Sequence, residues 1–353
     1  WSIAKRDRHN DGGFTSGEQA VGDPYNTGAI ETCCTVSWMA LGTEYLQLSK
    51  NSYVADELEL SYFNGMLGAL LEDDKYVTYN TPMDGRKVAS QVDIAFQYNS
   101  GSPDFNCCQA NLSRGLGELS QWGVIGNDTD LYLNYYGPSA ANTLTPGGNA
   151  ITIKQETEYP KDGAIKITLD MAKNEAFNFN LRIPVWSYTN TVKVNGEEMK
   201  NVVPGEYYSI NREWKNGDVI ELDLEMSVHY WLGEKNYKGY SSVYYGPILL
   251  ALDSNYSDLA RDAARFQTTD LKKMTVSDGS GKGCWLFFET KTVNGIPVKL
   301  VDFASAGQDN STYYSWLKVN HNMNYLPYVK GGNPIWNNSP DLPSYTVTAG
   351  KAD

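Results

Sequence analysis

The sequence predicts an α+β protein of several domains, in which a helical first part precedes two antiparallel β-rich parts. Apolar residues recur with a helical period over roughly the first 125 residues, and the period changes to two after Gly126. At 353 residues the chain is long enough to form two or three cores rather than one. These observations place a helical domain first and β-sandwiches after it.

Three helices are expected in the first part, and each is indicated by apolar side chains that share one face. The first helix runs from about 31 to 50, and the third runs from about 109 to 122. The second is indicated by an i, i+4 ridge formed by Leu58, Tyr62, Met66 and Leu70. The irregular stretch 73–106 is too long for a simple connector, so we expect it to build a site.

Short alternating segments, separated by Gly, Asn and Pro, indicate antiparallel sandwiches in the rest of the chain. The first β region has alternating segments at 164–169, 177–183, 191–196 and 219–225. The second begins near Lys238 and has strand-like segments at 243–252, 296–301 and 315–319. The tail from Gly331 is rich in Asn, Pro and Gly and is expected to be partly irregular.

Composition narrows the classes of partner. A net charge of -13 and a pI near 4.8 argue against nucleic acid and anionic membranes, and no apolar run is long enough to span a bilayer. The chain has 25 Tyr and 9 Trp. Such rings suit the face of a sugar, and they equally suit the cores and surfaces of β-sandwiches.

The five cysteines stand at 33, 34, 107, 108 and 284, so four of them form two adjacent doublets. Adjacent cysteines bond to each other only with strain, and cross-pairing both doublets would be crowded. One carboxylate and three thiolates, from Glu31, Cys33, Cys107 and Cys108, would make a tetrahedral set for zinc. The alternative is that the cysteines are small buried apolar residues.

A second candidate group is acidic. The glycine-rich segment 12–18 ends at Glu18, thirteen positions before Glu31. A glycosidase needs a proton donor at the leaving oxygen, and Glu18 could serve as one. The alternative is an exposed surface carboxylate. The three histidines are far apart, and neither a Walker loop, an H-E-x-x-H motif nor a G-x-S-x-G elbow is present.

The motifs together resemble the β-L-arabinofuranosidase family of glycoside hydrolases, a zinc-cysteine family. The resemblance is carried by Gly17-Glu18-Gln19-Ala20, Gly28-Ala29-Ile30-Glu31-Thr32-Cys33, Phe63-Asn64-Gly65, Cys107-Cys108-Gln109-Ala110-Asn111, and, in the β regions, Leu181–Trp186, Tyr245–Pro247 and Val301–Gly307. It covers nearly the whole chain.

The resemblance implies the C-terminal part of an (α/α) toroid or barrel, followed by two antiparallel β-sandwich domains. The expected boundaries are 1–128 for the partial barrel, 129–235 for the first sandwich and 236–353 for the second. It also implies a retaining glycoside hydrolase with bound zinc. Glu31, Cys33, Cys107 and Cys108 would hold the metal, Cys107 would be the nucleophile, Glu18 the acid/base and Tyr79 a substrate contact.

The implied substrate is a β-L-arabinofuranoside or a related plant-glycan sugar. Because a toroid needs about twelve helices and three are indicated, we expect a fragment with at most about six helices. Such a fragment would be inefficient alone and would need the missing half of the barrel or another chain. A non-catalytic carbohydrate-binding module is the alternative function. Localisation stays open between the periplasm or exterior and the cytoplasm.

Overall fold

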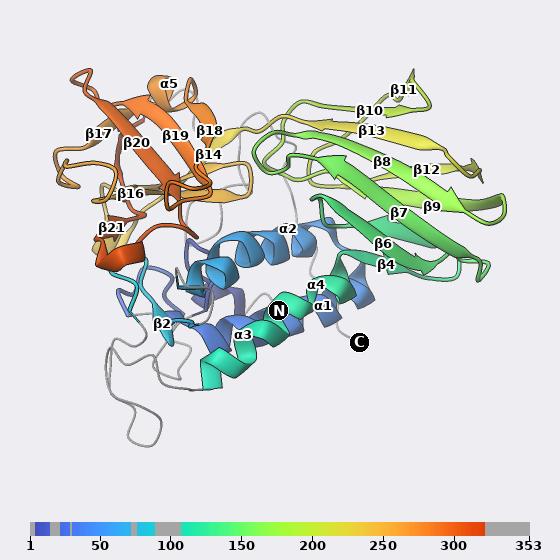
Figure 1. The fold of residues 1–353 in the computed structure, drawn as a ribbon, viewed down its shortest axis with the longest axis horizontal. Helices are drawn as coiled ribbons and strands as arrows, with labels where there is room; N and C mark the ends of the chain where they lie inside the picture. The colour runs from blue at the N-terminus through green and yellow to red at the C-terminus, as the bar shows by residue number, and fades with distance from the viewer. Residues whose placement is uncertain (1–3, 15–21, 29, 72–75, 89–106, 322–353) are drawn as a thin grey trace.

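The computed structural model describes residues 4–14, 22–28, 30–71, 76–88 and 107–321. Within these ranges a layer of helices lies along one side of the molecule, and two β regions stand next to each other on its other side (Figure 1). None of the described helices is long and apolar enough to cross a membrane. The α-helices are α1 (Thr32–Ser49), α2 (Ser52–Leu60), α3 (Cys107–Gly117), α4 (Leu119–Trp122) and α5 (Thr268–Leu271).

Helices form in all three predicted segments near the N-terminus, with two differences. The third segment is divided at Glu118 into α3 and α4, and the winding changes after α2. After α2 the chain continues as a π-helical segment, Ser61–Met66, and a 3-10 turn, Leu67–Ala69. The wider π turn shifts the expected i, i+4 ridge, so Tyr62 is only half-buried while Met66 is fully buried. Met66 packs against Gly115 of α3, where an added Cβ would lie 2.3 Å from the Met66 Cε atom. Gly115 therefore allows α3 to lie close to the rest of the helical layer.

The first β region consists of two sheets that pack face to face, as expected for a sandwich. All neighbouring strands are antiparallel except β5 and β9. The six-stranded sheet contains, in spatial order, β11 (Glu197–Glu198), β10 (Asn190–Val194), β13 (Val219–Leu224), β8 (Ala164–Met171), β7 (Ala150–Thr157) and β6 (Ser139–Leu144). The four-stranded sheet contains β12 (Tyr207–Trp214), β9 (Glu175–Arg182), β5 (Asp130–Leu133) and β4 (Val124–Gly126).

The second β region is built on an eight-stranded sheet. The predicted strand 243–252 is a hairpin of two strands, because Gly246 adopts a positive φ of 51° and reverses the chain. The main path of the sheet contains, in spatial order, β14 (Val228–Leu232), β15 (Ser241–Tyr245), β16 (Ile248–Asp253), β20 (Pro297–Asp302), β19 (Leu286–Lys291) and β18 (Thr275–Asp278). In addition, β21 (Tyr313–Tyr314) pairs with β16, and β3 (Asp84–Gly85) pairs with β21. A separate parallel pair joins β17 (Arg265–Gln267) to β22 (Lys318–Asn320).

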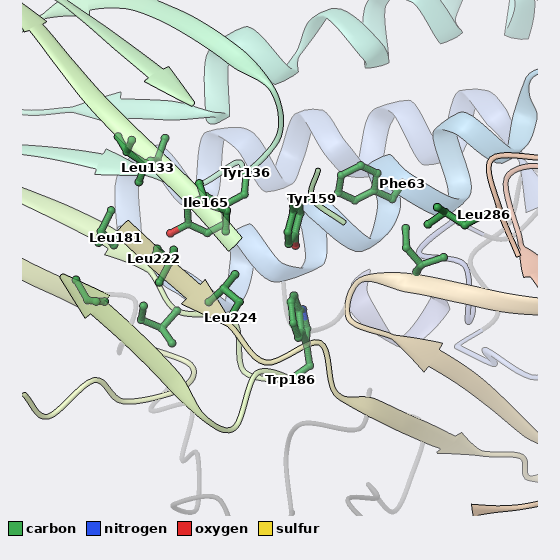
Figure 2. Packing of buried hydrophobic residues seen from close by; sticks show 14 of the residues in the cluster. Phe63, Leu133, Tyr136, Tyr159, Ile165, Leu181, Trp186, Leu222, Leu224 and Leu286 are labelled. Carbon is green, nitrogen blue, oxygen red and sulfur yellow. The ribbon is translucent and has the colours of Figure 1, made fainter. Parts of the chain in front are cut away.

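One apolar core runs from the first sandwich past the helical layer into the second β region. Figure 2 shows Phe63, from the π-helical segment, facing Tyr159 of the sandwich, with Leu286 of β19 on its other side. The Phe63 and Tyr159 ring centroids lie 6.1 Å apart. The burial of these rings stabilises the contacts of the helical layer with both β regions, so the position of the helices relative to the sheets is fixed.

Candidate active site

Three cysteine thiols meet where two helices begin. Cys33 is the second residue of α1, and Cys107 and Cys108 are the first two residues of α3. The two helices pack against each other, and the three sulfur atoms lie within 4.8 Å of one another. Cys108 is fully buried, while Cys33 and Cys107 are partly exposed. Cys33 and the Cys107-Cys108 doublet, which are far apart in sequence, therefore form one partly exposed cluster.

The surroundings of these sulfurs favour a thiolate. The Cys33 and Cys108 Sγ atoms are 3.2 Å apart and share a hydrogen bond. The hydrogen bond from Cys108 is the main reason that the pKa of Cys33 is lowered to about 7. The same hydrogen bond raises the pKa of Cys108. The N–H groups at the start of a helix add a favourable positive potential. The cluster thus holds a negative charge on Cys33 readily.

The predicted ligand Glu31 lies next to the thiol cluster but outside the group of three. It pairs with Asn80 across the short sheet of β1 (Ile30–Glu31) and β2 (Asn80–Thr81) and is the N-cap residue of α1. Its side chain is buried, and its Oε2 atom accepts a hydrogen bond from the Cys34 thiol at 3.5 Å. In this arrangement the Glu31 carboxylate contacts Cys34, and it is not among the ligand atoms that all lie within 4.8 Å of one another.

Tyr79 borders the same cluster through its backbone. Its carbonyl oxygen accepts a hydrogen bond from the Thr32 amide at 3.0 Å and lies 3.7 Å from Cys108 Sγ. The Tyr79 side chain is 5% exposed and packs among the apolar residues of the helical layer. The segment that carries it continues to β3, which is anchored to β21 of the second β region. The position of Tyr79 is therefore fixed from both sides.

Glu18 and Cys284 are not part of the described thiol cluster. Glu18 and most of the stretch 73–106 lie outside the described residues. Cys284 is far from the cluster in sequence and is buried in the second β region, where its thiol faces the Leu286 carbonyl at 3.8 Å. All five cysteines are described and none forms a disulfide.

Sequence reasoning gave no role to Asn111, which the structure places in the cluster. Its Nδ2 atom donates to Cys33 Sγ at 3.3 Å and to the Cys107 carbonyl at 3.0 Å. The sequence spacing could have indicated this position, because a residue four positions after Cys107 lies on the same face of a helix.

The donor set fits a metal ion of borderline-soft character. Three sulfurs that lie within 4.8 Å of one another, all at helix starts and one already favoured as a thiolate, are the donors that such ions prefer. The Glu31 carboxylate is near enough to raise the pKa of Cys33 by its charge. Cys33, Cys107 and Cys108 could therefore hold a metal, with a carboxylate beside them.

Two family profiles match the sequence. Residues 7–121 match the profile described as "Beta-L-arabinofuranosidase, GH127 catalytic domain", and residues 130–226 match "Beta-L-arabinofuranosidase, GH127 middle domain". Together they cover the helical layer and the first sandwich. No curated protein sequence matches the chain closely.

Solved structures share the fold. A glycoside hydrolase superposes with a TM-score of 0.73 at 19% identity, covering 88% of this chain and 59% of that one. A GH127 β-L-arabinofuranosidase from Geobacillus stearothermophilus T6 gives 0.74 at 19% identity, covering 90% and 55%. A further GH127 β-arabinofuranosidase gives 0.73 at 20% identity, covering 90% and 55%. The chain thus spans somewhat more than half the length of these structures.

Proposed function

The chain belongs to the β-L-arabinofuranosidase family GH127, and on that premise we propose that it carries the catalytic centre of a retaining glycoside hydrolase. The proposed substrates are β-L-arabinofuranosides or related plant-glycan sugars. Cys107 is the proposed nucleophile and Glu18 the acid/base. The observation that carries the proposal is the convergence of Cys33, Cys107 and Cys108 at two helix starts, in a chain of this family.

We also propose the division 1–128, 129–235 and 236–353, with the first part belonging to an (α/α) barrel. The hydrogen-bonded sheets differ from these bounds by one strand at each boundary, because β4 pairs within the first sandwich and β14 pairs within the second β region. The match of the middle-domain profile to residues 130–226 supports the first boundary. The packing of α1, α2 and α3 in one layer is compatible with an arc of such a barrel.

In the proposed reaction the Cys107 thiolate attacks the anomeric carbon as the bond to the leaving oxygen breaks. Glu18 gives its proton to that oxygen, which yields a thioglycosyl enzyme and the free alcohol. Glu18 then takes a proton from water, the water oxygen attacks the same carbon, and Cys107 leaves as a thiolate. Two inversions at one carbon retain its configuration.

Zinc is the proposed metal, with Cys33, Cys107, Cys108 and Glu31 as its ligands, and when bound it would keep the thiols deprotonated at neutral pH. The Cys33 and Cys108 sulfurs are joined by a hydrogen bond, and a metal bound to both would displace its proton. The Glu31 carboxylate, whose charge raises the pKa of Cys33, would be the fourth ligand. Tyr79 is the proposed sugar contact; in this structure its carbonyl oxygen borders Cys108 Sγ, and its side chain is 5% exposed.

We expect the purified protein to bind about one zinc ion per chain, with loss of the metal when Cys33 is replaced by Ser, because a hydroxyl is a much poorer zinc ligand than a thiolate. Elemental analysis after dialysis measures the stoichiometry. Cys284→Ser is the matched control, since Cys284 is equally a free thiol but lies in another part of the fold. Equal zinc content in both variants would remove the metal from the proposal.

The acid/base role predicts a dependence on the leaving group. Glu18→Gln is expected to slow hydrolysis of alkyl β-L-arabinofuranosides by about 10²–10⁴-fold and of p-nitrophenyl β-L-arabinofuranoside far less, because nitrophenolate leaves without protonation. Initial rates with the two aglycones, in reducing buffer with zinc, measure the ratio. A uniform loss with both aglycones would instead assign Glu18 to binding or structure.

A further inference from the structure

The Asn111 side chain connects the two helices that carry the thiols. Asn111 stands one turn after Cys107 on α3, and its Nδ2 atom donates to the Cys107 carbonyl at 3.0 Å. The same Nδ2 atom donates to Cys33 Sγ, on α1, at 3.3 Å. The first bond fixes the amide on its own helix, and the second reaches across to the neighbouring one.

An N–H donor on a sulfur has two effects. It fixes the rotamer of the cysteine, because the sulfur gains a hydrogen bond only in one orientation. It also withdraws negative charge from the thiolate, which makes that sulfur a steadier ligand and a poorer nucleophile. In the cluster it is Cys33 Sγ that receives this donor, in addition to the contact from Cys108.

We propose that Asn111 is a positioning residue that holds Cys33 Sγ in the orientation of a permanent metal ligand. This inference rests on the proposed function in taking the thiol cluster as a metal site. The two partly exposed sulfurs then have different roles. Asn111 holds Cys33 as a metal ligand, and Cys107 is the nucleophile. Outer-shell donors of this kind commonly change metal affinity by 10–100-fold when they are removed.

The test uses Asn111→Ala, Asn111→Asp and the control Ser113→Ala. Asp has nearly the shape of Asn but replaces the N–H donor with a carboxylate oxygen, so it separates hydrogen bonding from packing. Ser113 is exposed on the same helix, and its hydroxyl donates to the Ala110 carbonyl, away from the cluster. Zinc affinity is measured by competition with a chromophoric chelator. The thiolate-to-metal charge-transfer band is measured with Co²⁺ in place of zinc.

We expect both Asn111 variants to bind zinc at least about 10-fold more weakly, with the larger loss for Asp, and to shift the Co²⁺ band. Ser113→Ala should match the unchanged protein in both readouts. An Asp variant with unchanged affinity and band would overturn the role of the donor, even if the Ala variant failed to fold by circular dichroism. Absence of a thiolate band in the unchanged protein would overturn the proposed metal site itself.

Discussion

Replacing Cys107 by Ser is expected to abolish turnover, with a loss of at least about 10³-fold, in line with the removal of nucleophiles from other enzymes. A serine hydroxyl is almost fully protonated at neutral pH and would be a weak nucleophile at the start of α3. It would also be a poor metal ligand, so the variant loses both proposed roles at once. Initial rates with p-nitrophenyl β-L-arabinofuranoside, in the intact enzyme with zinc, measure the effect.

A direct measurement of the bond to Cys107 accompanies the rates. Mass spectrometry of enzyme quenched during turnover should find one pentosyl unit on the peptide that contains the Cys107-Cys108 doublet, and none after Cys107→Ser. Cys34→Ser is the matched control, because Cys34 follows Cys33 directly and its thiol contacts Glu31 rather than the three sulfurs. Its effect should be mild. If Cys34→Ser proved as damaging as Cys107→Ser, the assignment of nucleophile and ligands would have to be redrawn.

Much of the fold could be predicted from local patterns. The alternation in 164–169 predicted β8, and the apolar face of 31–50 predicted α1, because each pattern reflects one buried face of one element. Residues 243–252 were predicted to be β-rich, but their division into the hairpin of β15 and β16 was not, since both halves are apolar and the turn depends on the φ of Gly246. The π-helical winding at 61–66 likewise has no simple signature in the sequence.

The thiol cluster shows what spacing alone could supply. Doublets 33–34 and 107–108 predicted metal chemistry, but which sulfurs face each other depends on how α1 packs on α3. The hydrogen bond from Cys34 to Glu31 depends on side-chain rotation at the start of α1, which no pattern encodes. The role of Asn111 required knowledge that Cys33 lies across from it, a tertiary contact 78 residues apart.

Another tertiary contact joins the helical layer to the first sandwich through a buried arginine. The Arg182 guanidinium, at the end of β9, is fully buried and donates to Asp56 Oδ1 at 2.5 Å and to Glu59 Oε1 at 2.6 Å, both on α2. Its Nε atom donates to the Asn134 carbonyl at 2.7 Å. Tyr159, in the core shown in Figure 2, donates a further hydrogen bond to Glu59 at 2.7 Å. The Arg182 guanidinium thus forms ion pairs with two carboxylates, Asp56 and Glu59, that are buried from water.

Arg182→Met is therefore expected to destabilise the fold strongly, by about 3–5 kcal/mol, because it leaves two uncompensated carboxylates in the core. The matched control is Lys154→Met. Lys154 pairs with Asp170 at 3.1 Å on the sandwich surface, where both side chains are more than half exposed. That pair should contribute no more than about 1 kcal/mol. Thermal and urea unfolding of both variants measure the difference, and equal losses would contradict the role of the buried cluster.

The Arg182→Met defect should also depend on pH. Burial raises the pKa of Asp56 to about 7 even with Arg182 beside it, and burial likewise raises the pKa of Glu59. Without the arginine both values rise further, so the folded variant binds protons more tightly than its unfolded chain, whose carboxyls titrate near 4. Stability should then fall as pH increases from about 4 through 7 and above. Adding Asp56→Asn and Glu59→Gln should remove this pH dependence, because the neutral amides leave no buried charge to compensate.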